Sequence, residues 1–414
     1  MPTLEPLTET VPLHAFAGYG IELEYMIVDR HDLSARPLAD RLLRDVDGQI
    51  ANEVEHGALA WSNELVMHVV ELKTNGPAAG LDGLDGLFHA SVVEINRRLH
   101  EHGAQLLPTA MHPLFDPDRE TRLWPHGQNE IYAAYDRIFG CRGHGWSNLQ
   151  SMHINLPFHD DEEFRRLHAA IRVVLPLIPA LAASSPLEQS RPAAWLDNRL
   201  RYYRDNQRFI PEISGRGIPE AVAGIDEYRR CILEPMYRAI APHDRDRILA
   251  DDWLNSRAAI ARFERQTIEI RIVDLQESPR ADLAIAEAVV GLVRLLYDES
   301  LAGYEQQQAI DTSILAEQLW RTAEFGGEAL CDNPAYLRLL GQTGARSGQA
   351  LWRALLGRVA LSQGASRTLN EMLGRGTLAE AIVRRLGKEP AQESIIDCYR
   401  EIAQCLVDQR LFQS

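Results

Sequence analysis

The sequence predicts an α+β fold, in which an antiparallel sheet packs against helices on one face and keeps a polar second face. Two observations predict it. Four segments that lie far apart in the chain alternate apolar and polar residues, as strands do when only one face is buried. From residue 281 onward the apolar residues instead recur with helical spacing. We therefore expect an antiparallel-sheet cup with packed helices over residues 1–280 and a helical region over residues 281–414 that packs on the same domain.

The predicted strands share a period of two. In the first, Glu22 and Glu24 lie on one side and the apolar residues on the other. A short apolar run without strict alternation adds one further strand. In chain order, the predicted strands cover residues 18–29, 64–74, 105–111, 149–158 and 267–274.

The predicted helices follow from apolar residues spaced three and four apart. Two prolines, Pro176 and Pro179, are expected to kink or end one of these helices. The segment 184–220 shows no period, and its aromatic residues argue against disorder, so we expect an ordered but irregular stretch. The predicted helices cover residues 81–102, 165–182, 225–240, 283–301, 313–324, 350–361, 369–386 and 393–411.

Composition excludes several classes of partner. Lysine and arginine total 43 against 59 acidic residues, a net charge of −16, which argues against nucleic acid. The longest uncharged run, residues 173–187, contains three prolines and is too short to span a membrane. The first ten residues lack the basic region of a secretory signal. Five scattered cysteines suit a reducing cytoplasm. We expect a cytoplasmic protein, and the sequence leaves a homo-oligomer open.

Each alternating strand places titratable or polar side chains on its polar face. A solvated sheet surface would explain the alternation by itself. Glutamates that converge in one basin, however, are tolerable only with bound cations. Oxygen-rich sites suit Mg²⁺ or Mn²⁺, with histidine as an additional ligand, and Mg²⁺ often also holds substrate phosphates. The residues thus support either a metal–nucleotide site on a concave sheet or a solvated face, and they are Glu22/Glu24, Glu71/Lys73, His153/Asn155 and Glu269/Arg271.

Arginines gather in the irregular segment 184–220. Beside an acidic metal site, guanidinium groups that bind phosphate or carboxylate in a bidentate manner are expected. The same residues would also suit a solvated loop. The cluster consists of Arg191, Arg199, Arg201, Arg204 and Arg208.

Six motifs resemble the glutamate–cysteine ligase family, and most closely its shorter GCS2-type bacterial carboxylate–amine ligase branch. They span roughly residues 18–274 and occur in the order found in that family: GIELEY, VVELKTNGP, TAMHP, SMHINLPF, LAASSP and TIEIRIVD. The resemblance implies a glutamine-synthetase-like antiparallel sheet bent into a cup, with helices on its outer face. It makes residues 1–280 the catalytic part of the chain.

The activity that the resemblance implies is ATP- and Mg²⁺-dependent ligation, with Mn²⁺ as an alternative ion. ATP phosphorylates the side-chain carboxylate of glutamate, and an amine such as cysteine attacks the acyl phosphate. The partners are therefore small molecules: ATP, a glutamate-like carboxylate and an amine. The segment after LAASSP runs EQSRPAAWLDNRL where the family often has glycines, so the sequence does not identify the amine.

The resemblance also assigns roles to individual residues. Glu64 resembles a further acidic position, but strand parity places it opposite Glu71, so it joins the site only if it precedes the strand or a bulge intervenes. The resemblance implies metal ligands at Glu22, Glu24, Glu71, Glu269 and His153, nucleotide contacts at His153, Asn155 and Arg271, and catalytic cations at Arg271 and Arg199.

Two other functions remain open from the residues. One is a metal-dependent phosphotransferase or kinase on the same cup. The other is a catalytically silent scaffold, which the retained and mutually repulsive glutamates disfavour.

Overall fold

The computed structural model describes residues 12–413. The first ten residues, for which we expect no secretory signal, lie outside this range. Within residues 12–413, no helix combines the length and the hydropathy needed to cross a bilayer.

An eight-stranded sheet forms the centre of the molecule, and all its strand pairs are antiparallel. The strands lie in the order β2-β3-β4-β1-β6-β10-β9, and β5 pairs with the far end of β1. The strands are β1 (Gly20–Asp29), β2 (Glu53–His56), β3 (Leu59–Asn63), β4 (Val69–Thr74), β5 (Ala104–Leu107), β6 (Ser151–Pro157), β9 (Ala259–Arg262) and β10 (Thr267–Asp274).

The register brings the predicted polar positions beside one another at the middle of the sheet. Glu24 pairs with Glu71 across β1 and β4, and Glu22 pairs with His153 across β1 and β6. The register of β10 against β6 shifts between Ile270 and Val273, which marks a β-bulge. The polar faces of the four central strands therefore lie on one side of the sheet, as the alternation predicts.

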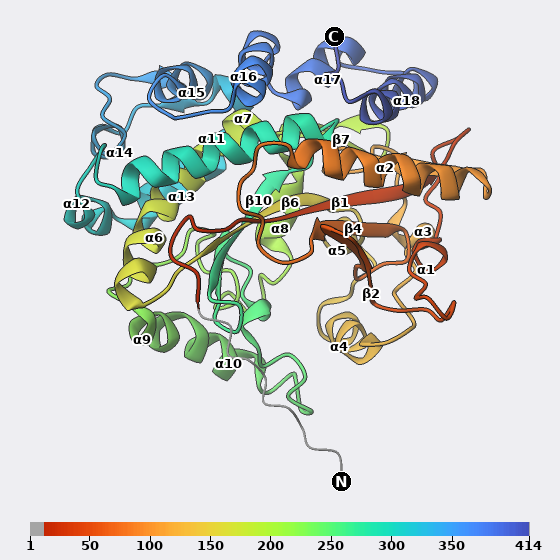
Figure 1. Cartoon of the computed structure of the whole chain (residues 1–414), viewed down its shortest axis with the longest axis horizontal. Coiled ribbons are helices and arrows are strands. Elements are labelled where there is room, and N and C mark those ends of the chain that lie inside the picture. Colours follow the sequence, from red (N-terminus) through yellow and green to blue (C-terminus); the bar gives the residue numbers. More distant parts are fainter. Residues whose placement is uncertain (1–11, 414) are drawn as a thin grey trace.

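Helices cover the apolar face of the sheet (Figure 1). The long helices α2 (Leu84–His100) and α11 (Pro279–Tyr297) lie across it, and α6 (Asp161–Val174) packs beside α11. Apolar side chains of the strands, among them Leu23 and Ile154, join the same buried cluster as Phe88 of α2.

The C-terminal helices form a second row over α2 and α11 (Figure 1). Residues from the sheet and from helices beyond residue 281 belong to one hydrophobic cluster. Whether residues 1–280 and 281–414 form one domain stays a prediction. The helices of this row and its approaches are α12 (Tyr304–Ala309), α13 (Thr312–Phe325), α14 (Pro334–Leu339), α15 (Gly348–Leu356), α16 (Gln363–Arg375), α17 (Leu378–Leu386) and α18 (Gln392–Asp408).

The helix expected over residues 369–386 is two helices. Gly376 has a φ of 90°, which ends α16, and Thr377 begins α17 with a capping box completed by Glu380. The apolar spacing continued across this break and hid it.

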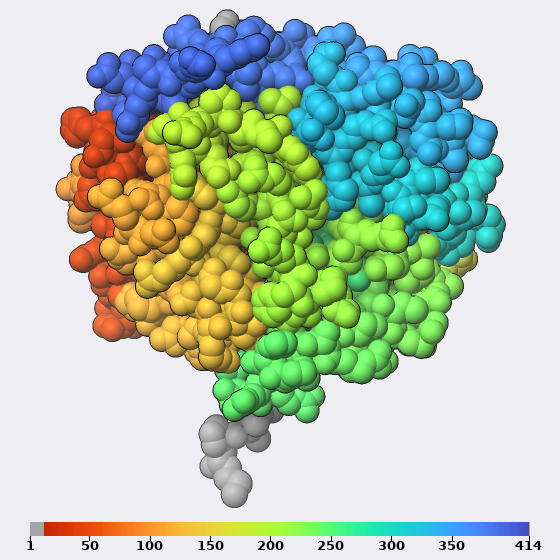
Figure 2. Space-filling view, turned by 180° about the vertical axis from the view of Figure 1, so that it is seen from behind, coloured from red at the N-terminus to blue at the C-terminus, as the bar shows by residue number. Residues whose placement is uncertain are grey.

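The segment 184–220 contains more regular structure than expected. It forms a two-strand hairpin, β7 (Leu187–Glu188) and β8 (Arg191–Pro192), and the helix α8 (Asn198–Asp205). Asp197 caps α8 by accepting a hydrogen bond from the Leu200 amide at 2.9 Å. In Figure 2 this segment, in yellow-green, lies on the surface between the orange segment that precedes it and the blue C-terminal helices.

The remaining elements are short or irregular, and several lie on the side of the sheet opposite α2 and α11 (Figure 1). They are α1 (Ala39–Leu42), α3 (Pro117–Glu120), α4 (Asn129–Phe139), α5 (His144–Ser147), α7 (Pro179–Ala182), α9 (Ile225–Tyr228), α10 (Glu234–Ile240), the 3₁₀ turns Leu175–Leu177, Asp252–Leu254 and Gly326–Glu328, the π turn Arg229–Leu233, and the pair β11 (Leu330–Cys331) and β12 (Arg346–Ser347).

Candidate active site on the polar face of the sheet

Glu22, on β1, lies at the centre of the polar face. Its carboxylate accepts a hydrogen bond from Asn155 Nδ2 at 2.9 Å and contacts His153 Nδ1 at 2.9 Å. His153 and Asn155 alternate with apolar residues along β6, so both project onto the same face. Next to them, Glu24 accepts hydrogen bonds from the amide and the hydroxyl of Ser151, at 2.6 and 2.9 Å.

Glu71, on β4, completes a group of potential metal ligands. One ligand atom from each of Glu22, Glu71 and His153 lies within 4.8 Å of the other two. The Glu71 carboxylate accepts a short hydrogen bond from the Ser62 hydroxyl and lies 3.4 Å from Lys73 Nζ. Three donor atoms this close, two of them carboxylate oxygens, suit a hard divalent cation.

Glu269, on β10, forms the other wall of the cup with two arginines. Its carboxylate lies 3.0 Å from Arg262 Nη1 and 2.9 Å from Arg271 Nε, and 3.8 Å from His153 Nδ1. Arg271 also donates from Nη1 to the Asn255 carbonyl at 3.2 Å. The site therefore brings two arginines beside its carboxylates, and guanidinium groups can bind phosphate or carboxylate.

The titration of these groups shows excess negative charge in the cup. Burial and the charge of Glu22 raise the pKa of Glu71 to about 7. Burial lowers the pKa of His153, but the hydrogen bond to Glu22 and the neighbouring carboxylates outweigh it and raise that pKa to about 9. Burial raises the pKa of Glu22, but His153 holds it well below its usual range. A proton on His153 or on Glu71 thus offsets negative charge that a bound cation would also offset, and the donor set fits Mg²⁺ or Mn²⁺.

Glu64 joins this environment from a turn. It follows β3 and precedes β4, so the parity argument that separated it from Glu71 does not apply. Burial and the charges of Glu24 and Glu71 raise the pKa of Glu64 well above its usual range. Glu64 thus precedes the strand, which is one of the two conditions under which we expected it to join the site.

Sequence analysis missed four side chains that contact the site. Ser62 lies on β3, and Arg262 lies on β9, neither of which was predicted as a strand. Arg265 Nη1 lies 3.9 Å from Glu22, and Ser151 binds Glu24. The period-two pattern of SMHIN places Ser151 with His153, a signal that was available. The strands LAWSN and AIAR are short and almost wholly buried, and so carry no alternation.

Among the described residues, Arg199 forms an ion pair with Asp274 and not with a carboxylate of the cup. It is 1% exposed, and its Nε lies 2.6 Å from Asp274 Oδ1. Its Nη1 donates to the Arg271 carbonyl at 3.4 Å, and its Nη2 has no hydrogen-bond partner among the described residues. The other four arginines of the predicted cluster are less enclosed, so Arg199 is the member of that cluster that reaches the site strand.

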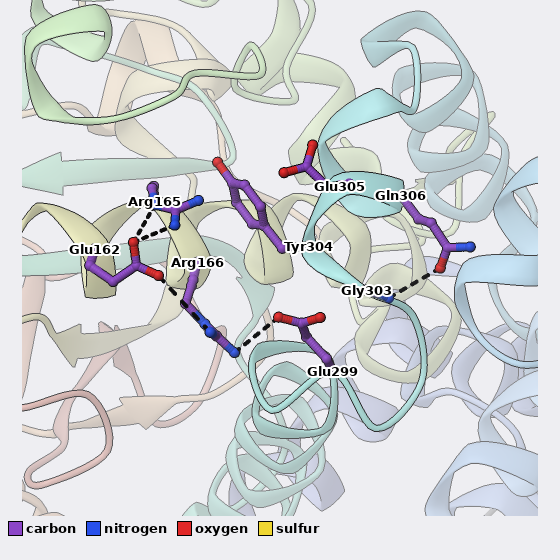
Figure 3. A pocket seen from close by; sticks show the side chains of 8 residues that line it. All are labelled: Glu162, Arg165, Arg166, Glu299, Gly303, Tyr304, Glu305 and Gln306. Atoms are coloured by element: carbon purple, nitrogen blue, oxygen red, sulfur yellow. Dashed lines mark hydrogen bonds and ion pairs between the residues drawn. The ribbon is translucent and has the colours of Figure 1, made fainter.

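A separate hollow of about 300 Å³ lies between α6 and α12 (Figure 3). Arg166 Nη2 lies 3.3 Å from Glu299 across it, and the Arg165 guanidinium lies 4.4 Å from the centre of the Tyr304 ring. None of the site residues predicted from the sequence lines it. Its arginines are matched by neighbouring carboxylates, which leaves little net charge to attract a ligand.

Comparisons with known proteins agree with the resemblance. The model of glutamate-cysteine ligase family 2 (GCS2) matches residues 19–377. An "Uncharacterized protein" of Archaeoglobus fulgidus is 31% identical over 387 residues, covering 94% of this chain and 98% of that protein. A protein of Streptomyces avermitilis, named "Putative glutamate--cysteine ligase 2-1", is 24% identical over 398 residues, covering 92% of this chain and 98% of that protein.

Among solved structures, the glutamate–cysteine ligase of Francisella tularensis, in complex with AMP, superposes with a TM-score of 0.61. The identity is 13%, and the match covers 94% of this chain and 88% of that one. At this identity the match concerns the fold, and it confirms the predicted class of antiparallel sheet with outer helices and a helical C-terminal region.

Proposed function

The chain belongs to glutamate–cysteine ligase family 2, and we propose that it joins a carboxylate, the side chain of glutamate, to an amine with consumption of ATP. The observation that carries the proposal is the convergence of Glu22, Glu71 and His153 within 4.8 Å on one face of the sheet. Family membership supports carboxylate–amine ligation, and the AMP complex of the Francisella tularensis ligase supports a nucleotide on this fold.

The residues of the cup divide into ion holders and anion holders. Glu22, Glu24, Glu71, Glu269 and His153 are placed to hold Mg²⁺ or Mn²⁺, with Glu64 beside them. Bound, these ions would offset charge on the transferring phosphoryl group. Asn155 and His153 are proposed to contact the nucleotide as well.

Arg271 is the cation best placed to bind the γ-phosphate or the substrate carboxylate. Its side chain is 23% exposed, and its Nε lies 2.9 Å from Glu269. Arg199 has one nitrogen, Nη2, without a hydrogen-bond partner among the described residues and is proposed as a second anion contact. Because a carboxylate must meet ATP before an amine attacks, two guanidinium groups, Arg271 on β10 and Arg199 on α8, suit the orientation of two anions.

The test is ADP release with Mg²⁺ and ATP against a panel of amines, with and without glutamate. Release that requires both glutamate and one amine supports the ligase. Phosphate that accumulates on a single acceptor, with no second substrate, would show a phosphotransferase instead. No release with any pair, together with no binding of Mg²⁺ and ATP in calorimetry, would leave the scaffold.

The matched variants are Glu71→Gln in the cup and Glu55→Gln on β2, where the glutamate is exposed. Both remove one carboxylate from the same sheet. Loss of turnover in Glu71→Gln with full turnover in Glu55→Gln assigns the activity to the cup. Equal turnover in both variants would contradict the assignment.

A further inference from the structure

The site arginine Arg271 lies in an irregular part of its strand. Ile270 pairs with Ile154 and Val273 pairs with Met152, so two residues of β10 face one residue of β6. Such a bulge leaves the intervening backbone without its ladder partner and turns the side chain out of the regular alternation. Something other than the sheet must then fix the direction of Arg271.

The backbone of Arg271 is held from two sides. Its amide donates to the Ala258 carbonyl at 3.0 Å, and its carbonyl accepts from Arg199 Nη1 at 3.4 Å. The first bond comes from the chain next to β9. The second comes from α8, a helix of the irregular segment that has no place in the sheet.

Arg199 is in turn fixed by Asp274, at the end of the same strand. Its Nε lies 2.6 Å from Asp274 Oδ1, and the other oxygen of Asp274 accepts from the Ser184 amide and the Ser185 hydroxyl, each at 2.9 Å. Ser185 Oγ also accepts from the Arg199 amide at 3.1 Å. Asp274 is 0% exposed and Arg199 is 1% exposed, so the pair lies in a region of low dielectric, where hydrogen bonds are electrostatically stronger than in water.

We propose that Asp274 is a positioning residue, which acts through Arg199 to hold the bulge and so directs the Arg271 guanidinium at the reacting anions. The inference rests on the proposed function for the identity of those anions. Its structural part, the direction of Arg271, does not. Residues 184–205 of the segment 184–220 would then help to position Arg271, because they include the two serines and the arginine that bind the site strand.

A simple loss of activity would not distinguish positioning from folding. Removing one partner of a buried ion pair leaves the other charge uncompensated and destabilises the protein. The test variant is therefore the double change Asp274→Asn with Arg199→Met, which removes both charges and keeps the side-chain volumes close. The matched control is Glu277→Gln with Arg375→Met, a buried ion pair in which neither residue contacts Arg271.

The first readout is the coupling of each double variant to Arg271→Lys. A misplaced catalytic group costs about 100-fold in kcat/KM, and we expect at least that loss in the Asp274 double variant, which also removes the proposed anion contact of Arg199. If that variant has already misdirected Arg271, adding Arg271→Lys costs much less than it does in the wild type. In the control background Arg271→Lys should cost its full wild-type factor. Losses that multiply to within about twofold in the Asp274 background would overturn the proposal.

The second readout does not depend on turnover, so it still applies if the proposed function fails. In protein labelled with ¹⁵N-arginine, the Arg271 Nε–H signal is assigned by its loss in Arg271→Lys. We expect this signal to shift and to exchange faster with solvent in the Asp274 double variant and to stay unchanged in the control. An unchanged Arg271 signal in the Asp274 double variant would overturn the proposal, whatever reaction the enzyme catalyses.

Discussion

The two faces of the central sheet are built from the same strands but follow opposite rules. On the packed face, residues such as Leu23 and Ile154 are 0% exposed and belong to the main hydrophobic cluster. On the polar face, one residue earlier in each strand, Glu22 and His153 form a charged contact beside further carboxylates. Burial of the apolar face stabilises the folded protein, whereas the polar face holds like charges at close range.

Adjacent residues of the same strand therefore serve different ends: one stabilises the fold and the next belongs to the candidate site. Neighbours in sequence point to opposite faces, so adjacent substitutions should have opposite consequences. A change on the packed face should lower the free energy of unfolding and spare turnover. A change on the polar face should abolish turnover and spare the fold.

The largest effect is expected for Glu71→Gln on the polar face. Loss of an ion-holding carboxylate removes several kcal/mol of transition-state stabilisation, so turnover should fall about 10³-fold. Without metal, the free energy of unfolding should stay the same or rise, because burial and the charge of Glu22 both disfavour the charged Glu71. ADP release and urea unfolding in EDTA measure the two quantities.

If Glu71→Gln lowered stability as strongly as turnover, the contrast between the two faces of the sheet would not hold at Glu71. That result would mean that Glu71 supports the fold through Ser62 and Lys73 and not the reaction.

On the packed face, Ile154→Ala should lower the free energy of unfolding by about 3 kcal/mol, because it opens a cavity between β6 and the helices. The folded fraction should keep most of its turnover at low temperature. Asn155→Ala, the next residue on the same strand, is the matched variant and should show the reverse: reduced turnover with a smaller loss of stability. Chemical denaturation and initial rates of both variants test the pair.

The smallest effect concerns a titratable group on the packed side. His168 on α6 is buried against Phe164, and neither of its ring nitrogens has a hydrogen-bond partner within residues 12–413. Burial, with the charges of Arg172 and Arg257, lowers its pKa to about 3 in the folded protein. The unfolded chain takes up the proton near pH 6.5 and the folded protein does not, so stability is full above pH 6.5 and is lost as the pH falls toward 3.

The variant that isolates this effect is His168→Phe. Between pH 6 and pH 4 its stability should fall less steeply than that of the wild type, by about 1.4 kcal/mol per pH unit. Urea unfolding at several pH values gives both slopes. Identical slopes would show that His168 is protonated inside the folded protein.

The sequence predicted the parts of the site that lie on alternating strands. Glu22, Glu71, His153 and Glu269 share a face because period-two patterns fix which side each residue takes, and the register then brings them together. The neighbouring strands β3 and β9 were not predicted, because LAWSN and AIAR are almost wholly buried and show no alternation of apolar and polar residues. Their site residues, Ser62 and Arg262, could therefore not be predicted from the alternation.

Residues outside the strands were less predictable for a different reason. Helix α8 has the sequence NRLRYYRD, in which Arg199 is buried by an ion pair and not by hydrophobicity. No periodic pattern signals a buried charge whose partner, Asp274, lies 75 residues away. The break between α16 and α17 did carry a local signal, since Gly376 and the capping box from Thr377 to Glu380 stand in the sequence.

Binding of Mn²⁺ to the unliganded protein, followed by the loss of the free-ion EPR signal, tests most directly whether the polar face is a cation site. The wild type and Glu55→Gln should bind Mn²⁺ with the same affinity. Glu71→Gln should bind it about 10-fold or more weakly, since even residues that only support a metal ligand change affinity by about that factor. Equal Mn²⁺ affinity in the wild type and Glu71→Gln would contradict the account.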